Sequence, residues 1–243
     1  MFPAMLRKIS GYILSLLLLI LSCANATAQE VELADTSTGL RTRGPRIGVD
    51  IASLALLYFE PERMVYSLSI DYEYAQDIYP AAELGFQTVS ISRPEYNYKS
   101  TGWFTRLGTD VNLLKYEGTD IYEMMYAGFR YGFSRMRHEA SGISIEDLVY
   151  GDFTVGSIPQ GSINTHFISL VGGVRVELAR NFFMGWSVFM NIRFYQSGAE
   201  GMDPYNIPGF GKGANRVTVT FNYTVSYRIP MQQYTPKIKA GKK

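Results

Sequence analysis

The sequence predicts an all-β protein: an eight-stranded antiparallel up-and-down β-barrel that crosses a membrane. Apolar and polar side chains alternate almost without a break from Gly44 onward, which is the period of a β-strand. After the first 28 residues, no apolar run reaches the roughly 20 residues that a membrane-spanning helix needs. The polar phase of the alternation carries almost no lysine, whereas a water-exposed surface of this size would carry many.

The first segment is typical of a secretory signal. Arg7 and Lys8 precede an apolar run from Tyr12 to Leu21, and Ala26-Thr27-Ala28 offers the small residues that a signal peptidase reads. We therefore expect residues 1–28 to be a signal peptide that is cleaved after Ala28. A transmembrane anchor is the alternative, but the apolar run is short for spanning a bilayer.

The only cysteine of the chain, Cys23, lies inside this signal. A lipoprotein signal would make it the lipidated N-terminus, but the Ala-x-Ala motif just beyond it favours an ordinary signal residue. The mature chain then contains no cysteine, which excludes disulfides, a thiol nucleophile and a cysteine-ligated metal.

Eight strand patterns follow a polar stretch at 29–43, which has no period and predicts a flexible periplasmic leader. They lie near 46–58, 64–75, 82–92, 101–115, 122–138, 165–178, 182–196 and 217–229. Eight is an even number, as in bacterial single-chain barrels, and each strand can supply the roughly 9–11 residues needed to cross a bilayer. The barrel domain is expected over 44–230, followed by a polar basic tail over 231–243.

The connections predict an orientation. With the N-terminus in the periplasm, the outward connections are 59–63, 93–100, 139–164 and 197–214, and the inward turns are 76–81, 116–121 and 179–181. The two longest connections then face outward, which is the asymmetry expected of outer-membrane barrels.

Alternation alone does not say which face points outward. A soluble periplasmic lipocalin-like carrier also has eight strands, with its apolar face inward, and it is one alternative. The scarcity of lysine favours the membrane, and so do aromatic residues near strand ends, which suit the two interfaces. These aromatics are Tyr58, Tyr72, Tyr74, Trp103, Tyr116, Phe182, Phe194 and Tyr227.

Charged residues in the polar phase are expected to point into the lumen. They are Asp50, Asp71, Glu73, Arg106, Asp110, Arg130, Arg175, Glu177, Arg193 and Arg228. An eight-stranded barrel is just wide enough to be filled by its own side chains. Because buried charges need partners, a structural charge network is favoured over a proton or ion path.

The two histidines, His138 and His166, are expected near the outer rim. Ser134 and Ser141 lie close to His138 in sequence, and a Ser–His pair would be an activated nucleophile for an enzyme that modifies outer-membrane lipid. This enzyme is the second alternative. No third orienting residue can be named, so His138 and Ser134 are catalytic candidates without a constellation, and we expect no enzyme. No metal site and no cofactor are expected, since the histidines lie on diverging faces.

The outer loops 139–164 and 197–214 are the remaining candidates for binding a partner. The second loop carries Tyr205, Ile207 and Phe210 among prolines and glycines that would stiffen it. A loop that folds over the barrel mouth accounts for the same residues and is favoured. Expected partners are outer-membrane lipid, the barrel assembly machinery and an unidentified surface partner. The formal charge of +1 gives no reason to expect nucleic acid.

Three short stretches rich in glycine and aromatics carry a resemblance: 125–132, 207–211 and 227–230. On these residues, the chain resembles an uncharacterised family of small outer-membrane β-barrels, a domain of unknown function of the Bacteroides group. The resemblance covers about 44–231 and implies a barrel in the outer membrane, without an activity. The chain departs from the usual barrel pattern in one respect. Outer-membrane barrels typically end on an aromatic residue, whereas here a polar basic tail follows the last strand. The sequence thus predicts an outer-membrane barrel with a structural or partner-binding role.

Overall fold

A computed structural model describes residues 41–94, 96–114, 122–145, 153–155, 157–198 and 203–235. Its elements are β1 (Arg41–Arg43), β2 (Pro45–Asp50), α2 (Ala52–Phe59), β3 (Arg63–Tyr72), β4 (Ile78–Ser92), β5 (Asn97–Asn112), β6 (Met124–Ser141), β7 (Ile143–Ile145), β8 (Phe153–Val155), β9 (Ile158–Ala179), β10 (Phe182–Ser197), β11 (Asn206–Ile207), β12 (Gly211–Lys212), β13 (Val217–Arg228) and β14 (Gln232–Tyr234). In this described part, no helix is long and apolar enough to cross a membrane.

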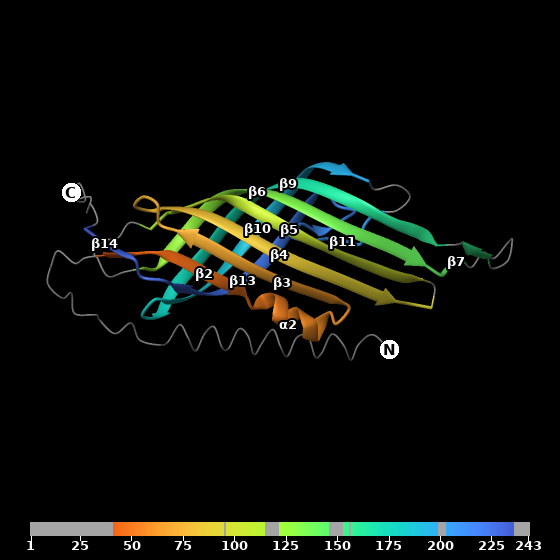
Figure 1. The fold of residues 1–243 in the computed structure, drawn as a ribbon, viewed down its shortest axis with the longest axis horizontal. Coiled ribbons are helices and arrows are strands. Elements are labelled where there is room, and N and C mark those ends of the chain that lie inside the picture. Colours follow the sequence, from red (N-terminus) through yellow and green to blue (C-terminus); the bar gives the residue numbers. More distant parts are fainter. Residues whose placement is uncertain are drawn as a thin grey trace, which may run out of the picture. The chain divides into compact units, whose positions relative to one another are not determined.

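The long strands form one closed barrel (Figure 1). Their order around the barrel is β2, β3, β4, β5, β6, β9, β10 and β13, and β13 returns to pair with β2. Every neighbouring pair is antiparallel and consecutive among these strands, so the chain runs up and down around the wall. The predicted eight-stranded antiparallel up-and-down barrel is confirmed.

The alternation in the sequence separates the two faces of the wall. Along β4, for example, Glu83 and Gln87 are buried, whereas Leu84 and Phe86, which lie between them in the sequence, are exposed. The exposed apolar side chains of the barrel wall include Ile47, Val49, Met64, Tyr66, Leu68, Ile70, Leu84, Phe86, Trp103, Leu107, Val111, Phe129, Tyr131, Leu170, Leu178, Trp186, Val188, Met190, Val217, Val219 and Phe221. The apolar face therefore points outward and the polar face points into the barrel.

The first strand is much shorter than the predicted 46–58. β2 ends at Asp50, and the chain turns into the helix α2. The Asp50 carboxylate accepts hydrogen bonds from the backbone N–H of Ala52, at 3.1 Å, and from the hydroxyl of Ser53. These bonds satisfy free donors at the start of a helix. The sequence after Asp50 also loses its polar alternate positions, which a strand with one polar face needs.

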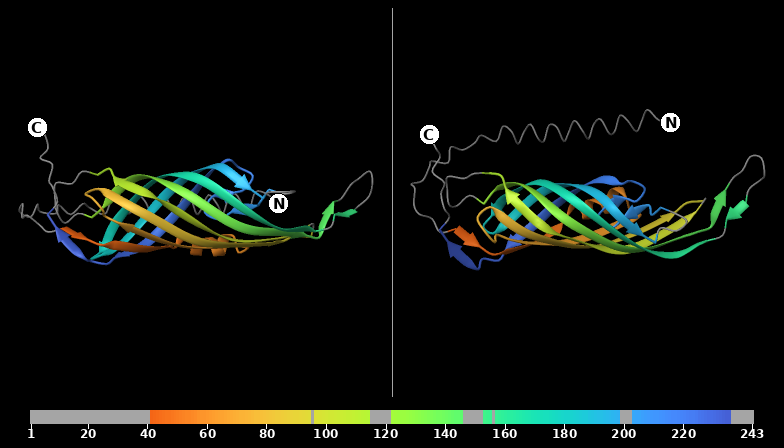
Figure 2. Two further views of the ribbon diagram at one scale, coloured as in Figure 1. Left: turned by 45° about the horizontal axis from the view of Figure 1, so that its top comes forward. Right: turned by 90° about the horizontal axis from the view of Figure 1, so that it is seen from above.

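The expected outer loop 139–164 is largely paired strand. β6 continues to Ser141, β9 begins at Ile158, and β7 pairs with β8 between them. β4 and β5 also begin earlier than predicted, and the pair Ser92–Asn97 leaves only a short connection. In both views of Figure 2, the yellow, green and teal strands β4, β5, β6 and β9 reach beyond the rest of the barrel at one end.

The segments flanking the barrel pair with each other. β1 falls within the range expected to be a flexible leader, β14 falls within the expected basic tail, and the two form a small antiparallel sheet. We call the end of the barrel that carries this sheet the inner end, and the opposite end the outer end. The predicted tight turn at 179–181 is present, with Asn181 in the left-handed region at φ 65°. The signal 1–28, Cys23, Tyr116 and the turn 116–121 lie outside the described residues.

Candidate functional site

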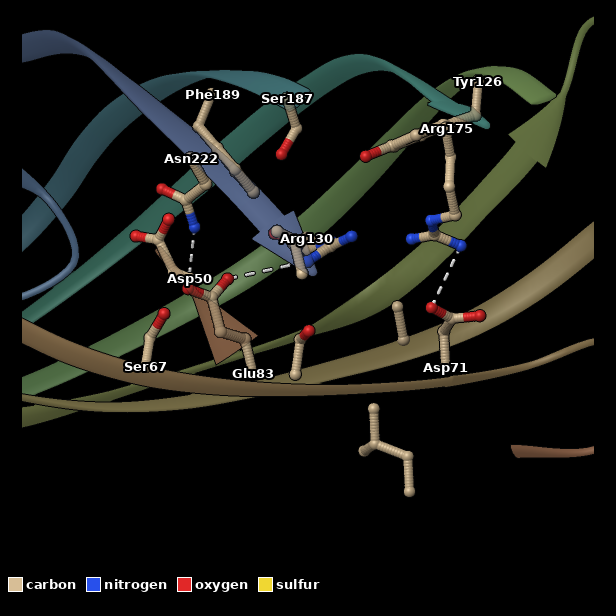
Figure 3. Close-up of a pocket in the computed structure, with 14 residues that line it drawn as sticks. Asp50, Ser67, Asp71, Glu83, Tyr126, Arg130, Arg175, Ser187, Phe189 and Asn222 are labelled. Atoms are coloured by element: carbon tan, nitrogen blue, oxygen red, sulfur yellow. Dashed lines mark hydrogen bonds and ion pairs between the residues drawn. The ribbon is translucent and has the colours of Figure 1, made fainter. Parts of the chain in front are cut away.

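The interior of the barrel holds two linked groups of charges. In the first, Asp71 faces two arginines: its carboxylate accepts a hydrogen bond from Arg46 Nε at 2.7 Å and lies 3.2 Å from Arg175 Nη1. All three side chains are about nine-tenths buried or more. Figure 3 shows Asp71 and Arg175 facing each other at one end of a cavity inside the barrel.

The second group lies farther along the lumen. Arg106 pairs with Glu83 at 2.8 Å, and Arg130 pairs with Asp110 at 2.6 Å and with Glu83 at 3.7 Å. Asn222 also donates a hydrogen bond to Glu83, at 3.2 Å. The partnered charges explain how so many ions are kept in the interior, since an unpaired buried charge is costly.

A third group of charges closes the inner end. Arg228 lies 3.5 Å from Glu177, and Arg41 of β1 lies 3.8 Å from Glu73. The ring of Tyr122 lies beneath both guanidinium groups, with Arg228 3.8 Å and Arg41 5.1 Å from its centroid. Such cation–π contacts add to the ion pairs when the groups are desolvated.

The structure thus joins eight of the ten predicted lumen charges to an ion partner and places the other two differently. Arg193 donates to the carbonyl oxygen of Gly213 at 2.7 Å, and the Asp50 carboxylate holds the start of α2. Sequence reasoning missed three partners: Arg41, Arg46 and Glu83. Glu83 lies in the segment 82–92, where one phase mixes polar and apolar residues (Gly85, Gln87, Val89 and Ile91), and Arg41 lies in the stretch predicted to be a leader.

The loop 203–214, called the plug loop, folds into the outer end of the barrel. Ile207 and Phe210 are fully buried and pack in one cluster with Met136, Ile163 and Phe167. The Arg106 guanidinium donates to the carbonyl oxygen of Gly209, which tethers the loop to the charge network. Gly209 has φ 70°, a conformation that favours glycine.

Backbone and side-chain amides complete this attachment. Asn191 donates to the carbonyl oxygen of Phe210 at 3.0 Å, and Gln87 donates to Asn206 at 3.0 Å. Of the three loop residues proposed to bind a partner, only Tyr205 is exposed. Ile207 and Phe210 instead hold the loop inside the barrel mouth, where a surface partner does not reach them.

The catalytic candidates do not come together. Ser134 and His138 lie on the same face of β6, four residues apart, so their backbones are about 13 Å apart. Ser134 donates a hydrogen bond to the carbonyl oxygen of Trp103 at 3.4 Å. His138 is buried beside Tyr98, with ring centroids 6.1 Å apart. The two side chains therefore do not form the Ser–His pair that nucleophilic catalysis requires.

The second histidine lies on the outward face. His166 contacts Tyr131 through its Nδ1 atom and is surrounded by Phe133, Phe194 and Tyr195, with ring centroids 4.9 to 6.2 Å away. Among the described residues, no group of three or more His, Cys, Asp or Glu side chains is placed to hold a metal ion.

The wall of the barrel is incomplete beside α2. Within the described residues, the pair of β2 and β3 that lies nearest the outer end is Val49–Leu68. The corresponding pair of β2 and β13 is Asp50–Thr224. β3 and β13 both continue farther toward the outer end. We call the stretch between residues 63–67 of β3 and residues 217–222 of β13 the wall opening. Helix α2 lies against both of these strands (Figure 1).

Comparison with known proteins identifies the family. A family model described as "Domain of unknown function (DUF6048)" matches residues 9–234. The chain belongs to this family. The expected membership in a family of unknown function is confirmed, and the match extends farther toward the N-terminus than the resemblance at 44–231. No curated protein matches the sequence.

Solved structures that are similar to this chain include two from Acinetobacter baumannii. The crystal structure of Acinetobacter baumannii CarO2 is 13% identical to this chain, with a TM-score of 0.35, and covers 79% of this chain and 100% of its own. The crystal structure of Acinetobacter baumannii CarO is 12% identical, with a TM-score of 0.35, and covers 77% of this chain and 98% of its own.

Proposed function

We propose that this protein is a bacterial outer-membrane β-barrel without an open channel, which anchors an outer extension that binds a partner at the cell surface. One observation carries the membrane location: the wall is apolar outside and charged inside. On β5 the outward face from Trp103 to Val111, nine positions along the strand, carries Trp103, Leu107 and Val111 with uncharged threonines between them. This length matches the roughly 9–11 residues that a tilted strand needs to cross a bilayer.

Polar side chains take over the outward face beyond this belt. Toward the outer end, β5 exposes Lys99 and Thr101, and β6 exposes Arg135, Arg137 and Glu139. Charged side chains are costly within the hydrocarbon core and favourable outside it. The change from apolar to charged side chains supports a bilayer boundary near Trp103.

A soluble carrier of apolar ligands requires the opposite arrangement. Its lumen would be lined by apolar side chains around a cavity of roughly 300 Å³ or more. Here the described interior contains polar cavities of about 20 and 50 Å³, lined by residues such as Asp50, Glu83 and Asn222. Cavities of this size hold a few water molecules.

The outer extension is the part of β4, β5, β6 and β9 that continues beyond the apolar belt, together with β7 and β8. Its strand ends carry a polar hollow of about 430 Å³, lined in part by Asn97, Lys99 and Glu139. Tyr205 of the plug loop is also exposed at this end. Polar side chains and an aromatic on ordered strands are a suitable surface for a partner, since little ordering entropy is lost on binding.

Export and assembly follow from the same proposal. Cleavage after Ala28 would leave Gln29 as the first residue, which N-terminal sequencing of the mature protein checks. The barrel assembly machinery and outer-membrane lipid are the partners that this location requires. The Bacteroides group is the source that the resemblance implies.

The test is the cell fraction that holds the protein, together with its migration on a detergent gel with and without boiling. We expect the protein in the outer-membrane fraction, and we expect unboiled protein to migrate differently from boiled protein because the closed barrel stays folded in detergent. A protein recovered from the periplasm without detergent would overturn the membrane location.

A further inference from the structure

The wall opening lies between the interior cavities and a furrow on the outward face. The interior cavities and a furrow on the outward face share two lining residues, Asp50 and Ser67. Asp50 is the last residue of β2, and Ser67 lies on β3 beside it, where the β2–β3 pairing has just ended. Figure 3 shows both residues, with Glu83 and Asn222, at one end of the interior cavity. The interior cavities and the furrow thus lie on two sides of these two side chains.

The furrow, called the lateral furrow, is apolar. It has a volume of about 640 Å³ and is lined by Val49, Tyr66, Leu68, Leu84, Phe86 and Trp103. These side chains belong to the outward belt of β2, β3, β4 and β5. In a membrane-inserted barrel, the furrow therefore lies at the depth of lipid chains.

The polar cavity behind the opening contains hydrogen-bond donors and one hydrogen-bond acceptor that have no partner in the described chain. It is lined by Arg63, Gln87 and Arg106 and also by the carboxylates of Asp50 and Glu83. Arg63 pairs with Glu60 at 3.6 Å and Arg106 pairs with Glu83 at 2.8 Å, but the Nε atoms of both arginines and the Oε1 atom of Gln87 are buried without a hydrogen-bond partner in the described chain. Arg106 and Gln87 are almost completely buried. Buried polar atoms without partners are unusual in proteins, and two guanidinium N–H groups in one cavity favour an anionic oxygen.

Helix α2 covers this cavity from one side. Ser53 in its first turn is buried and lines the cavity. Asp50 accepts a hydrogen bond from the backbone N–H of Tyr223 at 3.0 Å as well as from Ala52 and Ser53. One carboxylate thus holds the start of α2 to the edge of β13, at the inner boundary of the opening.

We propose that the wall opening is a binding site for an anionic membrane lipid, with an acyl chain in the lateral furrow and the phosphate oxygens in the cavity that Arg63 and Arg106 line. The site rests on the proposed membrane location. The apolar side chains of the furrow would hold the acyl chain of the lipid, and the arginines would favour its phosphate group.

The tryptophans of the chain provide the measurement. There are two, Trp103 in the lateral furrow and Trp186 on β10, and their exposures are similar, at 40% and 43%. Around the wall, β6 and β9 separate β5 from β10. Two single-tryptophan proteins, Trp186→Phe and Trp103→Phe, therefore report separately on the furrow and on a control position of equal exposure.

Phosphatidylglycerol with brominated acyl chains, which quench tryptophan, is titrated into each full-length protein in detergent micelles. We expect saturable quenching of Trp103 near one lipid per protein, and only weak, unsaturated quenching of Trp186. Diacylglycerol with the same chains should bind about tenfold more weakly, because it lacks the charge-assisted hydrogen bonds to the arginines. Equal quenching of both tryptophans, or equal affinity for the two lipids, would overturn the site.

Two further variants assign the two halves of the site. Arg63→Gln should weaken phosphatidylglycerol binding about tenfold and leave diacylglycerol binding unchanged. Leu84→Phe should obstruct the furrow and weaken both lipids, whereas Leu170→Phe, on an exposed residue of β9 outside the furrow, should change neither. Each variant is first checked for heat-modifiable migration. Unchanged lipid binding by a folded Arg63→Gln or Leu84→Phe barrel would contradict this site without contradicting the membrane location.

Discussion

Asp71 links two arginines of the interior network, because its single carboxylate serves both Arg46 and Arg175, as Glu83 serves Arg106 and Arg130. Asp71→Asn keeps the shape of the side chain but leaves two buried guanidinium groups without an anion. We expect the free energy of unfolding to fall by about 3–5 kcal/mol, as for other broken buried ion pairs. Urea unfolding of the barrel in lipid vesicles measures this change.

The matched control is an ion pair on the surface. Glu62 lies 3.1 Å from Arg93, and both side chains are exposed. Glu62→Gln should change the free energy of unfolding by less than about 1 kcal/mol. Equal effects of the two substitutions would mean that water screens the interior network as it screens the surface pair.

Tyr234 makes the inner end sensitive to alkaline pH. Burial and a hydrogen bond to Glu73, at 2.8 Å, raise the pKa of Tyr234 to about 12. The unfolded chain releases the phenol proton near its ordinary pKa of about 10, so the folded state binds more protons between these values. Stability from this group is therefore complete below pH 10 and is lost as the pH rises toward 12.

Tyr234→Phe isolates this contribution, because phenylalanine has no proton to release. The difference in the free energy of unfolding between the natural protein and the variant should shrink from pH 10 to pH 12. Curves that stay parallel over this range would show that the Tyr234 proton does not contribute.

At the scale of the element, the plug loop behaves as part of the core rather than as a mobile loop. Phe210 packs against Phe167 with ring centroids 5.5 Å apart and is fully buried. Phe210→Ala should lower the free energy of unfolding by about 3–5 kcal/mol, through lost burial and the cavity left behind. Tyr205→Ala, at an exposed position of the same loop, should stay within about 0.5 kcal/mol. Thermal unfolding in detergent compares the two variants, and equal losses would place the loop outside the core.

At the scale of the whole molecule, the lumen is closed by three successive barriers. The plug loop fills the outer end, the ion pairs around Asp71 and Glu83 fill the middle, and the Tyr122 cluster fills the inner end. A barrel of eight strands leaves no width for a channel beside these side chains.

We therefore expect no ion conductance in planar lipid bilayers, even after residues 203–214 are replaced by a Gly-Ser linker. The linker variant removes the outer barrier but leaves the two charge groups in place. Steady conductance of the linker variant alone would show that the loop is the only barrier, and conductance of the natural protein would contradict the closed lumen.

The strand count, the up-and-down order and the separation of faces were predicted correctly from the sequence, because alternation depends only on neighbours along the chain. The prediction of a strand after Asp50 was wrong. The apolar residues there suit either a strand or a helix, and the hydrogen bonds of the Asp50 carboxylate to Ala52 and Ser53 stabilise the helix α2. The end of β6 was missed because the alternation changes phase there: Met136 and Ala140 are buried and Arg137 and Glu139 are exposed, so the apolar residues point inward.

The sequence by itself determined the fold class and the alternation of side chains between the two faces of the wall. Only the tertiary structure decided which charges meet, that Phe210 and Ile207 lie inside the barrel, and that the wall is open beside α2. The physical reason is that a repeating pattern specifies the direction of a side chain. Ion partners, the attachment of a loop and the register at which a strand ends depend on residues far away in the chain.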